Sequence, residues 1–161
     1  MRRSFFLLFL LGLCTPAAAQ KQSLGIFGGW GSFKENNRCF AIAEPSRLPR
    51  TGEARPFAAI GYWPRQRLRG QVHFRLSREK RRGSAVLLRI DDRSFQLIAG
   101  GTDAWAPDAR ADAEIVAAMR SGVDMVVETR STRGALVRDQ YRLRGAATAI
   151  DAAAIACAKM D

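Results

Sequence analysis

The clearest pattern along the chain is the alternation of polar and apolar residues over 71–77, QVHFRLS. Val72, Phe74 and Leu76 point to one side, and polar residues, His73 among them, point to the other. A period of two predicts a β-strand with one face in the core.

Six further runs rich in apolar and β-branched residues are bounded by turn residues, as strands are. They are 38–43, 57–63, 85–90, 94–99, 123–129 and 135–143. The first two are apolar on both faces after Arg38, which is typical of strands buried between layers. Asp91-Asp92-Arg93 and the STRG stretch at 131–134 are turn sequences, so each predicts a hairpin between its flanking strands.

Two segments have a helical period instead. Residues 109–121, ARADAEIVAAMRS, repeat alanine and valine at helical spacing, with Asp108 placed to cap the start and Gly122 the end. Residues 148–159 begin with Thr148 and carry an aspartate three positions later, which resembles a capping box. The second helix would present Cys157 on its apolar face.

These elements predict a mainly β fold: an antiparallel β-sandwich or a barrel-like sheet with two short helices, one of them C-terminal. Residues 44–56, with three prolines and several charges, predict a long surface connection. About 140 residues suit a single domain with its own core.

The N-terminal residues 1–19 have the features of a cleavable export signal. Arg2 and Arg3 precede an apolar run that is shorter than the roughly 20 residues needed to cross a bilayer as a helix. Ala17, Ala18 and Ala19 form the small-residue pattern of a cleavage site, so we expect cleavage after Ala19. The mature chain, 20–161, would then lie in the periplasm or outside the cell, with no transmembrane segment. A retained anchor and lipidation of Cys14 are the alternatives.

Cleavage would leave two cysteines, Cys39 and Cys157. An even number in an exported chain predicts a disulfide, because oxidising compartments form and keep such bonds. Two separately buried thiols are the alternative. The chain offers no clustered zinc ligands and no phosphate-binding loop in the right context, so we expect no cofactor.

The chain is strongly basic, with a net charge of +11, or 24 − 15 = +9 without Arg2 and Arg3. For an exported protein this favours anionic envelope components over nucleic acid as partners. The basic residues form two runs: Arg65, Arg67 and Arg69, and then Arg78, Lys80, Arg81 and Arg82. We interpret them as candidate anion-binding residues, the second run at a hairpin tip; a merely solvated turn is the alternative.

Aromatic residues offer a second kind of candidate site. Trp30, Tyr62 and Trp63 could form a stacking surface for a glycan or peptide, although large aromatic residues in a small β domain are more often core.

An enzymatic role has few candidate residues. His73 is the single histidine, and Asp103, Asp108 and Asp112 could hold a hard cation. The sequence therefore leaves a hydrolytic or cation-dependent activity only as the alternative.

Three motifs together resemble the invasion-associated locus B family of exported alphaproteobacterial envelope proteins: FGGWGSF leading to RCFAIAEP, AMRSGVDMVVETRS, and YRLRGAATAIDAAAIAC. The similarity runs from about Phe27 to Cys157. It implies a small β-rich envelope protein, and it implies the pairing of Cys39 with Cys157. Many relatives carry a further cysteine near the position of Lys34, which this chain lacks. We expect a non-catalytic envelope protein that binds an anionic envelope component or a protein partner; the sequence predicts no oligomeric state.

Overall fold

A computed structural model describes residues 21–48 and 55–160. The predicted export signal and its cleavage point lie outside these residues, as does part of the predicted surface connection. The described chain forms ten strands, one short 3-10 helix and two α-helices. In order they are β1 Gln22–Phe27, β2 Trp30–Glu35, β3 Arg38–Ala43, β4 Phe57–Trp63, η1 Pro64–Gln66, β5 Leu68–Arg75, β6 Val86–Ile90, β7 Arg93–Gly100, β8 Asp103–Trp105, α1 Ala109–Ser121, β9 Asp124–Arg130, β10 Leu136–Arg142 and α2 Ala146–Ala158.

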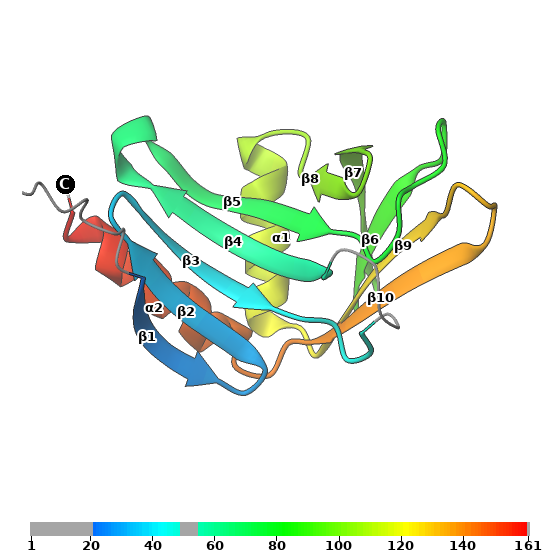
Figure 1. The fold of residues 1–161 in the computed structure, drawn as a ribbon. Coiled ribbons are helices and arrows are strands. Elements are labelled where there is room, and N and C mark those ends of the chain that lie inside the picture. Colours follow the sequence, from blue (N-terminus) through cyan, green and yellow to red (C-terminus); the bar gives the residue numbers. More distant parts are fainter. Residues whose placement is uncertain (1–20, 49–54, 161) are drawn as a thin grey trace, which may run out of the picture.

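The strands build one antiparallel sheet in the order β1-β2-β3-β4-β5-β8-β7-β6-β9-β10. The sheet curls, so that its last strand returns towards its beginning (Figure 1). Trp30 Nε1 in β2 donates to the Arg142 carbonyl at the end of β10 (2.9 Å), and the Ser46 amide donates to the Gln140 carbonyl (2.7 Å). The mainly β prediction is confirmed: the fold is a half-barrel with two helices.

The two helices cover the inside of the curl. α2 packs on β1 to β4, and α1 packs on β5, β7 and α2. The core consists of side chains from one face of each alternating strand. Val72 and Phe74 from β5 and Met125 and Val127 from β9 are all buried in it. Strand alternation is therefore what directs apolar side chains towards the helices.

Local predictions agree closely with several elements. β3, β4 and α1 have the predicted bounds, and the Asp108 side chain caps α1 by accepting a hydrogen bond from the Ala111 amide at 2.8 Å. The β6–β7 and β9–β10 hairpins form as predicted.

Two local predictions are wrong. α2 begins earlier than expected, after Gly145, and no side chain caps it, so Thr148 lies inside the helix and forms no capping box. β5 and β6 do not pair with each other, since β5 pairs with β4 and β8 while β6 pairs with β7 and β9. The basic run after β5 is therefore a crossover between two parts of the sheet and not a hairpin tip.

The start of α2 is held by a close backbone contact with the β1–β2 turn. Gly145 has φ +89°, and a Cβ there would overlap the Phe27 carbonyl oxygen. Gly28 has φ +58°, and a Cβ there would overlap the Arg144 carbonyl oxygen. Only glycine combines this left-handed backbone with such close approach. The FGGWGSF motif and the Arg-Gly step of the YRLRGAATAIDAAAIAC motif thus meet in space.

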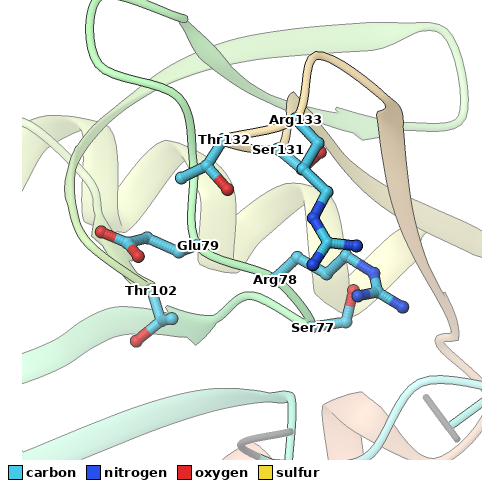
Figure 2. Close-up of a pocket in the computed structure, with 7 residues that line it drawn as sticks. All are labelled: Ser77, Arg78, Glu79, Thr102, Ser131, Thr132 and Arg133. Carbon is cyan, nitrogen blue, oxygen red and sulfur yellow. The ribbon is translucent and has the colours of Figure 1, made fainter.

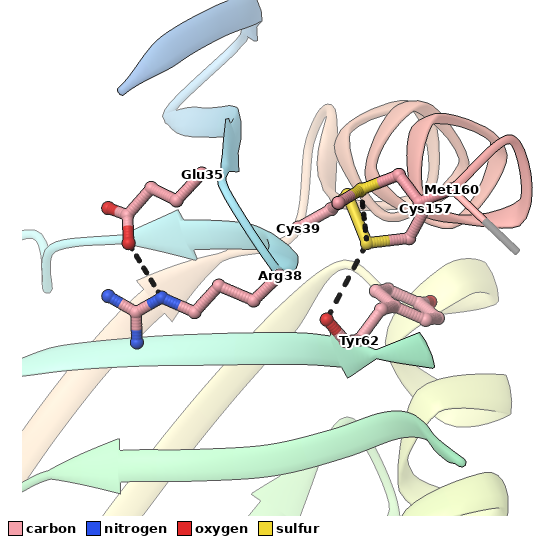
Figure 3. Close-up of a disulfide and its surroundings, with 6 residues drawn as sticks. All are labelled: Glu35, Arg38, Cys39, Tyr62, Cys157 and Met160. Atoms are coloured by element: carbon pink, nitrogen blue, oxygen red, sulfur yellow. Dashed lines mark hydrogen bonds and ion pairs between the residues drawn. A yellow bond between two sulfur atoms is a disulfide. The ribbon is translucent and has the colours of Figure 1, made fainter. Parts of the chain in front are cut away.

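The end of α2 is held covalently. Cys39 in β3 and Cys157 form a disulfide with Cα atoms 5.7 Å apart, which confirms the predicted pairing. The sulfurs are buried, and Met160 Sδ lies 3.7 Å from Cys39 Sγ (Figure 3). The bond spans 118 residues and joins the early strands to the last helix.

No helix among the described residues is long and apolar enough to cross a membrane.

Candidate functional site

The Arg78 pocket is a polar cavity of about 280 Å³ at the junction of three segments. We define it by its lining residues: Ser77, Arg78, Glu79, Thr102, Ser131, Thr132 and Arg133. The first three follow β5, Thr102 lies in the β7–β8 turn, and the last three form the tip of the β9–β10 hairpin. Segments far apart in the sequence therefore build one concave, hydroxyl-rich surface.

Backbone hydrogen bonds fix this junction. The Thr132 amide donates to the Glu79 carbonyl at 3.1 Å, the Lys80 amide to the Gly101 carbonyl at 3.0 Å, and the Leu76 amide to the Thr102 carbonyl at 2.7 Å. Lys80 and Ser131 also form a β-bridge. Each segment is thus tied to the one beside it, so the pocket is a built feature of the fold and not a gap between loose loops.

The charged groups of the Arg78 pocket are arranged asymmetrically. Figure 2 shows the guanidinium groups of Arg78 and Arg133 on the same side of the pocket, while the Glu79 carboxylate points to the opposite side. The described lining residues include two arginines and one glutamate, so their formal net charge is 2 − 1 = +1. Paired guanidiniums beside hydroxyl donors match the oxygens of a phosphate or carboxylate group.

Asp139 supports the pocket from inside. Its side chain, on the buried face of β10, accepts a hydrogen bond from the Ser77 amide at 2.8 Å. Burial raises the pKa of this carboxyl, although the hydrogen bonds from Ser77 act in the opposite direction. The contact links the crossover after β5 to the last strand of the sheet.

We expect the stability of the protein to depend on pH through Asp139. Because its folded pKa is raised, its contribution to the free energy of unfolding is full below the unfolded pKa of about 4 and is lost as pH rises through the folded pKa. Asp139→Asn keeps an acceptor for the Ser77 amide and should remove this loss. Urea unfolding from pH 3 to 8 should show wild type losing stability relative to Asp139→Asn as pH rises.

Asp139→Ala is the matched variant, since it removes the acceptor as well as the charge. We expect it to be less stable than Asp139→Asn by about 1 kcal/mol, because the Ser77 amide then lacks its partner. A wild type that gains stability over Asp139→Asn with rising pH would contradict the assigned direction.

The predicted basic residues are separated by the fold. Arg65, Arg67 and Arg69 lie in η1 and around the start of β5, and Arg78 to Arg82 follow its end, so the two runs do not form one surface. Of the second run, Arg78 lines the pocket, Arg81 and Arg82 are exposed, and Lys80 is half-buried with its Nζ donating to the Arg81 carbonyl at 3.2 Å.

The predicted stacking surface does not form as proposed. Trp30 is fully buried, with its indole N–H bonded to the Arg142 carbonyl, so it is a core residue and unavailable to a ligand. Tyr62 packs against the core and the disulfide, while the Trp63 ring lies over Gly61. The three aromatic residues serve different parts of the fold.

His73 and Asp103, two of the candidate catalytic residues, are in contact. His73 Nε2 lies 2.8 Å from Asp103 Oδ1, and Arg75 Nε donates to the same oxygen at 3.2 Å. Burial acts to raise the Asp103 pKa, but the hydrogen bonds from His73 and Arg75 outweigh it and lower that pKa. The histidine ring stacks on Trp105, with centroids 5.1 Å apart, and meets Phe57 edge-on.

The other two acids lie elsewhere. Asp108 caps α1, and Asp112 Oδ1 accepts a hydrogen bond from the Val72 amide at 2.8 Å. Burial raises the pKa of Asp112 despite that bond. Within the described residues, no three His, Cys, Asp or Glu side chains gather as metal ligands, so the suggested cation cluster of Asp103, Asp108 and Asp112 is not formed.

The Arg78 pocket contains residues that sequence reasoning missed. The sequence predicts a hairpin tip at STRG, but nothing in it places Ser131, Thr132 and Arg133 beside Arg78. That neighbourhood depends on the strand order, in which β9 and β10 follow β6 and not β5. The one signal in the sequence is Arg133, a basic residue in a predicted turn, where it could reach an anionic ligand.

Searches against family models, curated proteins and solved structures gave no match to this chain. The resemblance to the invasion-associated locus B family stays a prediction carried by the sequence motifs.

Proposed function

We propose that this protein is an exported, non-catalytic envelope protein of the invasion-associated locus B type that binds an anionic group of an envelope component in the Arg78 pocket. The observation that carries the proposal is the convergence of Arg78 and Arg133, from separate segments, on one side of a hydroxyl-lined pocket. The disulfide fits an oxidising compartment. The phosphate or carboxylate groups of envelope lipids and glycolipids provide the matching anions.

An enzymatic role rests on the His73–Asp103 contact and is the weaker proposal. The described partners of the histidine ring are Asp103, Phe57 and Trp105, none of which is a nucleophile of the serine, threonine or cysteine type. The Asp103 carboxylate also accepts a hydrogen bond from Arg75. This arrangement is typical of a structural cluster that links β5 to β8.

The test uses vesicles of phosphatidylglycerol, with phosphatidylcholine vesicles as the neutral comparison. Wild type should sediment with the anionic vesicles at low salt and much less at physiological salt, because salt screens exposed charges. Arg78→Gln/Arg133→Gln should bind about 30-fold more weakly at low salt, since each basic residue near an anionic surface contributes roughly 1 kcal/mol.

The matched control is Arg93→Gln/Arg110→Gln, which removes the same charge from the start of β7 and from α1. It should bind several-fold better than the pocket variant. If both double variants weakened vesicle binding equally, net charge alone would explain the binding, and the Arg78 pocket would be excluded as the site. Absence of binding by wild type would overturn a lipid target and leave a protein partner as the better candidate.

A further inference from the structure

A second concave surface, the α2 groove, lies at the opposite end of β5 from the Arg78 pocket. Its volume is about 290 Å³, and it runs between the last turns of α2 and the β4–β5 turn. Its lining residues are Tyr62, Pro64, Leu68, Arg69, Ala154, Ile155, Cys157 and Ala158. All but one carry apolar or aromatic side chains or a disulfide sulfur, so the lining is suited to a hydrocarbon.

Two large apolar side chains of the α2 groove are exposed to solvent. Ile155 is 58% exposed and Leu68 is 37% exposed, and they face the same groove from a helix and from a strand. The disulfide holds the helix end against β3, and the Tyr62 carbonyl lies 3.6 Å from Cys157 Sγ (Figure 3). The two walls are therefore held at a set separation, and the groove is pre-formed.

The charge in the lining of the α2 groove is positive. Within the described part of the chain, Arg69 is the one charged residue of the lining, and exposed Arg65 and Arg67 belong to the same turn region. Among the described residues that line the groove none is acidic, and Asp151, whose charge acts on Tyr62, is paired with Arg120 at 2.7 Å. The C-terminal end of a helix carries partial negative charge, so an anion is favoured at the β4–β5 turn and not at the end of α2. An apolar floor with a basic rim matches a ligand with a hydrocarbon chain and an anionic head.

We propose that the α2 groove binds a single-chain fatty acid, with its hydrocarbon chain along Leu68 and Ile155 and its carboxylate beside Arg69. The volume of the α2 groove is at the lower limit for ligand sites. It corresponds to the volume of roughly ten water molecules, at about 30 Å³ each. That is enough for one chain of medium length and not for the two chains of a phospholipid. The site is separate from the Arg78 pocket, and either proposal can fail alone.

The probe is dodecanoate, used below its micellar concentration and followed by isothermal titration calorimetry with the oxidised protein. Wild type should bind dodecanoate, and each methylene removed from the chain should weaken binding about fourfold, because a buried methylene contributes about 0.8 kcal/mol. Dodecyltrimethylammonium, which has the same chain and a cationic head, should bind at least roughly tenfold more weakly.

Two variants test the two halves of the site. Ile155→Asp should weaken dodecanoate binding more than about tenfold, and Arg69→Gln should weaken it about fivefold, the equivalent of one basic residue near an anion. The matched control is Ile98→Asp, which changes a residue of similar exposure, 54%, in β7, and it should bind as wild type does. Circular dichroism should show the same fold for all three.

Equal affinity for the anionic and the cationic amphiphile would overturn the role of the basic rim. Equal loss with Ile98→Asp, or no binding by wild type, would overturn the groove as a fatty-acid site. A dimer in analytical ultracentrifugation that Ile155→Asp dissolves would assign the exposed apolar residues to a contact between copies of the chain instead.

Discussion

Loss of the Cys39–Cys157 disulfide is expected to lower the free energy of unfolding by about 4–5 kcal/mol. The bond closes a loop of 118 residues, and in the chain-entropy model the stabilisation grows with the length of the loop. Urea unfolding of oxidised wild type, reduced wild type and Cys39→Ala/Cys157→Ala measures the difference. The last two proteins should unfold at similar urea concentrations.

The alanine pair also provides the control for the reductant. A reducing agent should change the unfolding midpoint of wild type and leave that of Cys39→Ala/Cys157→Ala unchanged. If oxidised and reduced wild type unfolded at the same urea concentration, the disulfide would not constrain the unfolded chain as proposed. Peptide mapping without reductant should recover Cys39 and Cys157 as a linked pair.

Trp30→Ala is expected to cost about 3–5 kcal/mol, which is a large part of the stability of a domain of this size. The side chain is fully buried, and its indole N–H closes the curl of the sheet by donating to the Arg142 carbonyl. The loss therefore combines a cavity in the core with a missing contact between β2 and β10. Urea unfolding at neutral pH measures it.

Trp30→Phe separates these two contributions. It keeps most of the buried apolar volume and removes the N–H donor, so we expect a loss of about 1–3 kcal/mol. Trp63→Ala is the control, because that residue is half-buried at the end of β4, with its ring over Gly61. If Trp63→Ala cost as much as Trp30→Ala, burial would not explain the importance of Trp30.

Local structure could be predicted where neighbouring residues decide it. Helix α1 has a capping aspartate, an amphipathic repeat and a terminal glycine in one continuous stretch, and its bounds are correct. β8 has only three residues, and β1 and β2 contain glycines that interrupt the apolar pattern, so neither period nor propensity revealed them.

Strand order could not be predicted, because it depends on contacts between distant segments. The run after Ser77 has the composition of a turn, and a turn there would pair β5 with β6. In the folded chain the Asp139 carboxylate holds the Ser77 amide and the β9–β10 tip holds Glu79 and Lys80, so the run crosses to the other part of the sheet. The Arg78 pocket exists because of that crossing.

The short strand β8 has a consequence for how the molecule opens. It joins β5 to β7 through three residue pairs on each side. The other strand pairings of the sheet contain more residue pairs. Proteins open locally where few contacts hold the structure, so the β8 pairings are expected to be among the weaker backbone contacts of the sheet. His73, Asp103, Trp105 and Arg75 all lie on the β5–β8 pairs, so their stacking and charge contacts add side-chain attachment where the backbone ladder is shortest. The single histidine of the chain therefore strengthens the contact between β5 and β8 through its side chain.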